Sequence, residues 1–373
     1  MKINLRYKLL NKSTVIACIT FTCIIISFFS HAQIDSTLTF FKTSIEPHYG
    51  FIIPHNQSMK YVVQKPVWGA DITFFKRTGG NRLWHLLYRK PSIGAGLHYM
   101  NLGNPDYFGS AIAVYVITGF YLKEKTNTFA YNFGYGLCYM TRPFNADNNY
   151  FNIAIGSHLN IFLRASFGYN AEIRNIGVKP FLSFIHFSNG SFKKPNLGLN
   201  MVSAGMMIAL PVKKQYCFPL IGVPNFLDEK YTVSVSAGTT VHQKEPPLSP
   251  LYPVYILSAE GAWVYSYKHS AGIGFYWTHD RAIIYQKDYP EHNPVRSGPY
   301  LHFNTFYGKF AFSAQSGVYI YDKYKHDAPV FTRLGFSYTF LPNLKTGFYL
   351  KSHFFVADYF ELSVSYTILN IKK

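Results

Sequence analysis

The last strand-like segment of the chain constrains the fold most, because its apolar and polar residues alternate one by one. In YFELSVSYTI (residues 359–368) the apolar side chains share one face, and Glu361, Ser363, Ser365 and Thr367 share the other. A period of two places successive side chains on opposite faces of a β-strand. Such a strand suits a transmembrane barrel, with lipid outside and polar side chains inside. It equally suits a water-soluble β-sandwich.

The number of similar segments and the excess of ring side chains favour the barrel. Aromatic residues make up 18% of the chain, with 31 Tyr and 34 Phe, whereas charged residues make up 14%. Aromatic side chains collect at both interfaces of membrane barrels. After Gln33 no uninterrupted apolar run approaches the length of a spanning helix, so a membrane location requires strands. We therefore predict an all-β fold, a transmembrane antiparallel β-barrel of about 12–16 strands.

The predicted strands are separated by breaks rich in Gly, Pro, Asn and Lys. They occupy residues 47–53, 68–75, 93–100, 110–122, 129–140, 151–160, 162–172, 178–188, 200–212, 231–241, 254–267, 269–277, 300–306, 309–321, 331–340, 345–354 and 359–371. A Pro-rich stretch at 213–224 separates residues 33–212 from residues 213–373. The second half either completes the same barrel or forms a second one. We favour a single barrel, because Pro and Gly are also common in turns.

The first 32 residues have the features of a secretory signal peptide. Basic residues precede the apolar run 15–29, and Ser30, His31 and Ala32 resemble a cleavage site. We expect cleavage near Ala32, which leaves residues 33–373 as the exported protein. An uncleaved anchor helix and a lipoprotein acylated at Cys18 are the alternatives.

The formal net charge of +18 favours an anionic partner. Export favours outer-membrane lipids over nucleic acid, for which the chain carries no recognisable motif. Cys138 and Cys217 are too far apart in sequence for a metal motif, and a disulfide between them stays open. We predict neither a metal nor an organic cofactor.

Two polar residues, His186 and Ser188, interrupt the apolar predicted strand that ends in FIHFS. His186 and Ser188 share a face with Leu182 and Phe184, and they would meet Asn200 if the segments before and after residues 189–199 form a hairpin. Residues two apart on a strand have Cα atoms about 6.6–6.8 Å apart, a gap that an imidazole can span. His186 could then act as base for Ser188, with Asn200 orienting the ring. The alternative is a structural polar pair, since the hydrolase elbow G-x-S-x-G is missing.

The run HFSNGSFKKPNLGLN (residues 186–200) resembles the active-site segment of the outer-membrane lipid A 3-O-deacylases, the PagL-like family of acyloxyacyl hydrolases. The shared pattern is H-x-S-N followed by K-x-P-N-x-G. The resemblance implies a small barrel that removes the 3-O acyl chain of lipid A, in lipopolysaccharide, through an acyl-enzyme. It makes Ser188 the nucleophile and His186 the base. The acidic residue of the family falls on Asn200, a neutral substitute, and Glu172 is another carboxylate that the site could recruit.

The same resemblance suggests donors for the oxyanion and contacts for the substrate. The oxyanion donors are the backbone N–H groups near Asn189 and Gly190 and the side chain of Asn196. Lys193 and Lys194 would bind lipid A phosphates or sugars, and other basic pairs, Lys76 with Arg77 and Arg89 with Lys90, could do so elsewhere. Each lysine could also be a solvated loop charge.

The C-terminal half has a polar cluster of its own. Residues 350–366 look like a recurring segment of longer relatives, and Lys351, His353, Asp358 and Glu361 either form a site or line the rim and lumen. The alternative to the esterase is a porin or a barrel that transports hydrophobic solutes, in which the 186–200 motif persists without activity.

Overall fold

The computed structural model describes eight stretches of the chain, residues 42–125, 127–210, 230–243, 247, 249–285, 293–325, 327–354 and 356–372. The predicted signal peptide with its cleavage near Ala32, and Cys217, lie outside the described residues. Cys138 is a free, buried cysteine.

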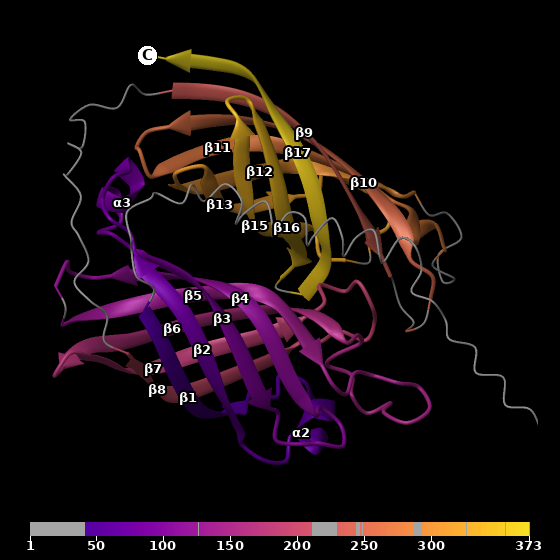
Figure 1. Ribbon diagram of the computed structural model, residues 1–373. Helices are drawn as coiled ribbons and strands as arrows, with labels where there is room; N and C mark the ends of the chain where they lie inside the picture. The colour runs from indigo at the N-terminus through magenta and orange to yellow at the C-terminus, as the bar shows by residue number, and fades with distance from the viewer. Residues whose placement is uncertain are drawn as a thin grey trace, which may run out of the picture. The chain divides into compact units, whose positions relative to one another are not determined.

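The first eight strands form a closed antiparallel barrel, in which each strand pairs with the next and β8 pairs back with β1 (Figure 1, indigo to magenta). They are β1 (Lys42–Ile52), β2 (Val67–Arg77), β3 (Ser92–Asn101), β4 (Ser110–Tyr121), β5 (Thr128–Met140), β6 (Leu159–Ile173), β7 (Ile176–Ser188) and β8 (Leu199–Ala209).

Eight further strands form a second antiparallel ring, closed because β17 pairs with β9 and β11 with β12 (Figure 1, orange to yellow). They are β9 (Lys230–His242), β10 (Tyr252–Val264), β11 (His269–Asp280), β12 (Val295–Tyr307), β13 (Phe310–Val318), β15 (Val330–Leu341), β16 (Leu344–His353) and β17 (Val356–Lys372). The short strand β14 (Tyr321–Asp322) pairs with β12.

Helical structure is limited to short connecting segments. They are α2 (Gln57–Val62), α3 (Leu83–Leu87) and the 3-10 helix η1 (Arg281–Tyr285). In the part of the chain that the structure describes, no helix has the length and apolar character needed to span a membrane.

The structure confirms the all-β antiparallel barrel fold, but it contains two rings where the sequence favoured one. The pairing of β8 with β1 closes the first ring, so the later strands cannot insert into it. One predicted strand, 151–160, is wrong over most of its length, because β6 begins only at Leu159. The side chain of Asn152 instead donates hydrogen bonds to the carbonyl groups of Tyr107 and Arg142, which holds this segment as a loop.

The barrel walls have the alternation that the sequence of β17 predicted. Glu361 is fully buried inside the second ring, whereas Val364 and Ile368 are 51% and 58% exposed on its outer surface. In β7 the outward side chains include Leu182, which is 62% exposed. An apolar outer surface on a closed antiparallel ring is the arrangement of membrane barrels.

Paired charges fill the interior of the first barrel. Arg164 Nη2 donates to Glu46 Oε2 at 2.9 Å, and its Nη1 lies 3.1 Å from Asp71 Oδ2. Tyr115 and His98 also hydrogen-bond to Asp71 Oδ1, at 2.8 and 3.0 Å. Nearby, a cavity of only about 30 Å³ remains beside Glu46. An eight-stranded ring is just wide enough for side chains to fill, and here they fill it.

Candidate active site

The hairpin of β7 and β8 brings the predicted residues together. Its register pairs His186 directly with Asn200. Leu182 and Phe184, which precede His186 on the same face of β7, are 62% and 44% exposed, so this face is the outer wall of the barrel. The prediction that His186 and Ser188 meet Asn200 across a hairpin agrees with this geometry.

Ser188, His186 and Asn200, here called the candidate triad, form a continuous hydrogen-bonded series. His186 Nε2 lies 3.0 Å from Ser188 Oγ, and His186 Nδ1 lies 2.6 Å from Asn200 Oδ1. An amide oxygen can only accept, so Nδ1 carries the ring proton and Nε2 of the neutral ring accepts from the serine hydroxyl. That is the tautomer a general base requires.

The loop after Ser188 contributes one unused donor. The Asn189 N–H group donates to Asn196 Oδ1 at 3.0 Å, and this contact turns the NH₂ group of Asn196 the other way. Asn196 Nδ2 is buried and has no hydrogen-bond partner among the described residues. Buried donors are normally satisfied, so an unused one beside a nucleophile fits an oxyanion donor. The Asn189 N–H group, by contrast, is already engaged.

Two glycines shape this loop. Gly190 and Gly198 have φ values of +59° and +77°, which L side chains rarely adopt. A Cβ atom on Gly198 would lie 2.9 Å from His186 Cε1 and 3.5 Å from Ser188 Cβ. Glycine at 198 therefore leaves the space that the His186 ring occupies.

Several other predicted contacts lie elsewhere in the barrel. Glu172 pairs with Gly177 on β7, whereas Ser188 pairs with Ile161, so Glu172 lies 11 residues along β6 from the site. At the rise of a strand this is about 36 Å, which excludes Glu172 as the acidic member. The basic pairs at 76–77 and 89–90 also lie at the opposite end of the barrel, where β2 meets β3.

Lys193 and Lys194 follow Ser188 in the same loop, but no described interaction joins either side chain to Ser188. The side chain of Lys193 is exposed and that of Lys194 is half-buried. The structure therefore leaves their role in substrate binding as a prediction.

Sequence reasoning missed His55, which follows β1 and lies beside the candidate triad. His55 Nδ1 is 3.4 Å from Asn200 Nδ2, and His55 Nε2 is 3.0 Å from the carbonyl oxygen of Leu197. The contact spans 145 residues, and only the closure of the ring by β1 and β8 creates it. The HNQ sequence at 55–57 carries no local signal for it.

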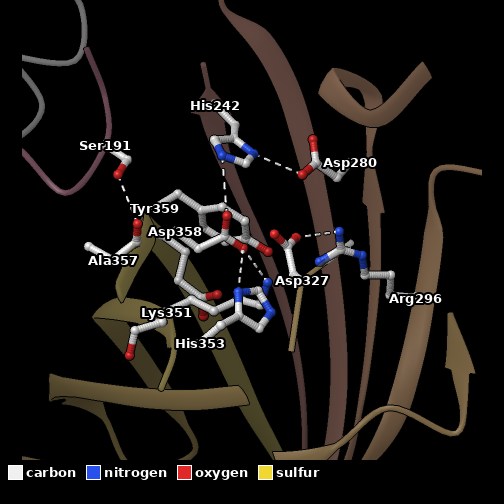
Figure 2. Close-up of polar contacts among 12 residues, drawn as sticks. Ser191, His242, Asp280, Arg296, Asp327, Lys351, His353, Ala357, Asp358 and Tyr359 are labelled. Carbon is white, nitrogen blue, oxygen red and sulfur yellow. Dashed lines mark hydrogen bonds and ion pairs between the residues drawn. The ribbon is translucent and has the colours of Figure 1, made fainter. Parts of the chain in front are cut away.

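The second barrel contains the other predicted cluster, extended by residues from two more strands, β9 and β11. His242 lies between two carboxylates, with Nδ1 2.8 Å from Asp280 and Nε2 3.2 Å from Asp358 (Figure 2). Lys351 Nζ donates to Asp358 at 2.6 Å, and His353 Nδ1 is 3.7 Å from the same carboxylate.

Glu361 does not belong to the cluster around Asp358. It pairs with Arg333, which also donates to Gln315, in a separate buried network. Of the four residues predicted in this half, the structure therefore brings together Lys351, His353 and Asp358. Each carboxylate of both networks faces a basic side chain, as buried charges require.

Two groups in the described residues have the spacing of metal ligands. They are His48 with Asp71 and His98 in the first barrel, and Asp327 with His353 and Asp358 in the second. In the first group Arg164 already pairs with Asp71, and in the second Arg296 and Lys351 already pair with Asp327 and Asp358. These cations compete with a metal for the carboxylates, so both groups fit charge networks better than metal centres.

Comparisons with solved structures give weak likenesses. A mutant of Rh. blastica porin has 10% sequence identity and a TM-score of 0.19, covering 89% of this chain and 100% of its own. The outer membrane protein OpdK from Pseudomonas aeruginosa has 11% identity and a TM-score of 0.24, covering 89% and 99%. Scores this low support no conclusion about fold or function. Among curated proteins no match was found.

Comparison with protein families is decisive. Residues 68–209 match the family "Lipid A 3-O-deacylase (PagL)", and residues 229–371 match "Acyloxyacyl hydrolase, C-terminal domain". The first match covers most of the first barrel with the candidate triad, and the second covers nearly all of the second barrel. The two matches together span most of the chain, which therefore belongs to the PagL family of lipid A deacylases.

Proposed function

We propose that this protein is an outer-membrane esterase that removes the ester-linked acyl chain at the 3-O position of lipid A. The observation that carries the proposal is the candidate triad on the outer wall of a barrel from this family. The exposed apolar side chains of Leu182 and Phe184 precede Ser188 on this wall, and Ser188 itself is only 4% exposed at the rim, so its acyl substrate would arrive from the lipid side. The substrate would then belong to the same class of molecule as the lipids that surround the barrel.

The proposed reaction has two half-reactions. Ser188 Oγ attacks the ester carbonyl while His186 Nε2 takes its proton; the tetrahedral intermediate then collapses, the ester C–O bond breaks, and His186 gives the proton to the leaving sugar oxygen, which becomes a hydroxyl. The acyl chain is then bonded to Ser188. Water, deprotonated by His186, attacks the acyl-enzyme, and the fatty acid leaves as Ser188 recovers its proton.

Asn200 orients the ring of His186 in this mechanism but brings no negative charge to the imidazolium. The NH₂ group of Asn196 is the proposed donor to the oxyanion, joined by the Gly190 N–H group. Lys193 and Lys194 are proposed to meet the phosphates of lipid A, in line with the net charge of +18. Export by the signal peptide, cleaved near Ala32, would deliver the chain to the outer membrane.

Transport through the barrel, the alternative from sequence, would require an open lumen. The buried contacts of Arg164 with Glu46 and Asp71 cross the interior of the first barrel instead. This observation favours the esterase over a porin.

The test is the mass of lipid A from cells or vesicles that contain each variant. Ser188→Ala and His186→Ala should each leave the lipid A mass unchanged, whereas the wild type should lower it by one acyl chain. Ser183, on the same strand, points inward and bonds to Ser203, so Ser183→Ala is the matched control and should retain activity. Loss of the acyl chain in the Ser188→Ala variant would overturn the proposal.

A further inference from the structure

His55 reaches the candidate triad because of how the first barrel closes. β1 pairs with β8, and one residue beyond β1 the Ile53 N–H group donates to the carbonyl oxygen of Asn200 at 2.8 Å. This bond fixes the backbone beside Asn200, and His55 follows two residues later. Its ring lies between the side chain of Asn200 and the carbonyl oxygen of Leu197.

A single backbone carbonyl sets the direction of every hydrogen bond in the series. The Leu197 oxygen can only accept, so His55 Nε2 carries the proton that bonds to it at 3.0 Å. His55 Nδ1 of the neutral ring is then an acceptor, and it faces Asn200 Nδ2 at 3.4 Å. The amide of Asn200 is thereby oriented with Oδ1 toward His186 Nδ1, at 2.6 Å.

The position of the Leu197 carbonyl is itself held by the loop that precedes β6. The Leu197 N–H group donates to the Ile153 oxygen at 3.3 Å, and the Gly198 N–H group donates to the Ala154 oxygen at 2.9 Å. The start of the series is therefore part of the folded backbone, and the His55 ring that binds to it is exposed.

Orientation matters because an amide has two different ends and a carboxylate does not. If the amide of Asn200 turned over, its NH₂ group would donate to His186 Nδ1. His186 Nε2 would then carry the proton and could not accept one from Ser188. In a serine protease triad, Asn in place of Asp costs about 10⁴ in rate for this reason, the wrong tautomer.

We propose that His55 is a positioning residue of the active site: its ring orients the amide of Asn200, which holds His186 in the tautomer that accepts a proton from Ser188. The proposal rests on the proposed function only in taking Ser188 as the nucleophile. A carboxylate at position 200 would fix the tautomer of His186 by itself. The amide of Asn200 does so only when His55 orients it.

The first experiment measures how fast Ser188 reacts with a small alkyl fluorophosphonate, which needs no lipid A. The serine oxygen forms a bond to phosphorus, fluoride leaves, and His186 takes the proton. His55→Ala should slow phosphonylation by about tenfold or more and lower kcat on lipid A equally, with KM nearly unchanged. His55→Gln should retain most of both rates, because its amide can accept from Asn200 and donate to Leu197.

The second experiment repeats the His55→Ala substitution in an Asn200→Asp background. Both oxygens of the carboxylate accept, so the tautomer of His186 no longer depends on His55, and the substitution should cost about twofold or less. This non-additivity separates an orienting role from a general structural one. Unboiled electrophoresis verifies that each variant forms the folded barrel.

Three results would overturn the proposal: a wild-type rate in His55→Ala, a His55→Gln variant as slow as His55→Ala, or an equal cost in the Asn200→Asp background. Failure of the proposed function looks different. In that case the wild type leaves lipid A intact, yet Ser188 still reacts with the fluorophosphonate and the His55 variants still differ.

Discussion

The Nδ1 atom of His186 lies 2.6 Å from the Oδ1 atom of Asn200, so the base of the candidate triad is oriented by a neutral amide. An amide can hold the imidazole in place, but it cannot stabilise the positive charge that develops when the ring takes the proton of Ser188. In the proposed mechanism, Asn200 therefore supplies orientation to His186 but no charge.

A negative charge introduced at position 200 should raise the rate of the proposed reaction. Asn and Asp have the same shape, so Asn200→Asp puts a carboxylate oxygen in the same place, and we expect turnover to rise by about tenfold or more. Turnover is followed as loss of the 3-O acyl chain from lipid A by mass spectrometry. Asn200→Leu, of similar size but unable to accept, is the control and should lose most activity. Equal rates for Asn200→Leu and the wild type would remove position 200 from the mechanism.

A methyl group on Gly198 should displace His186. The new Cβ would lie 2.9 Å from the Cε1 atom of the ring, and displacements of about 1 Å can cost about 100-fold in rate. Gly103 has nearly the same φ, +74° against +77°, and a Cβ there would meet Lys65 and Pro66 instead. Gly103→Ala is therefore a control for backbone strain, since both variants carry about 1–2 kcal/mol from the left-handed φ and Gly103→Ala adds a clash with the Lys65 carbonyl oxygen. We expect only Gly198→Ala to slow phosphonylation of Ser188.

The membrane location of the barrel wall can be tested at Leu182, in the middle of β7. Leu182→Arg should lower the free energy of unfolding from a bilayer by about 2–4 kcal/mol, because the charge would face hydrocarbon. Ile176→Arg, at the end of the same strand, should cost only about 0–1 kcal/mol. Urea titrations of barrels in vesicles measure both. If the two variants unfold at the same urea concentration, this part of β7 does not lie in the bilayer core.

In the second barrel, Asp358 should contribute strongly to stability. Asp358→Asn removes the charge that Lys351 and His242 share, and leaving a buried cation unpaired costs about 3–5 kcal/mol. Asp322 makes a longer contact of 3.6 Å with Arg296, so Asp322→Asn is the milder control. Tryptophan fluorescence in urea measures the midpoints. Identical midpoints for the two variants would show that the Asp358 cluster does not stabilise this barrel.

Local patterns were sufficient to predict most of the strands and the proximity of the three candidate-triad residues. Alternation within β17 and β7 gives the inward and outward faces, since a strand has a fixed period of two. His186 and Ser188 belong to one strand, and a short hairpin loop brings Asn200 opposite His186, so their proximity needs only one turn. The resemblance of residues 186–200 to the deacylases rests on the same short segment.

Predictions failed where a contact depends on pairing between distant strands. Residues 151–160 are apolar enough for a strand, but they find no strand partner at this rim, and the Asn152 side chain hydrogen-bonds the segment as a loop. Glu172 was a candidate carboxylate for the site because the sequence does not show which end of β6 it occupies. The sequence favoured one barrel over two, because a stretch rich in Pro, such as 213–224, is equally typical of a linker between barrels and of a turn within one.

The sequence by itself determined that the chain forms amphipathic antiparallel strands and that one hairpin carries His186, Ser188 and Asn200, because both properties are encoded within a few residues. Only the tertiary structure decided where each ring closes. The pairing of β1 with β8 limits the first ring to eight strands and carries His55 across 145 residues to Asn200. Such closure depends on the register of strands far apart in the chain, which no local pattern contains.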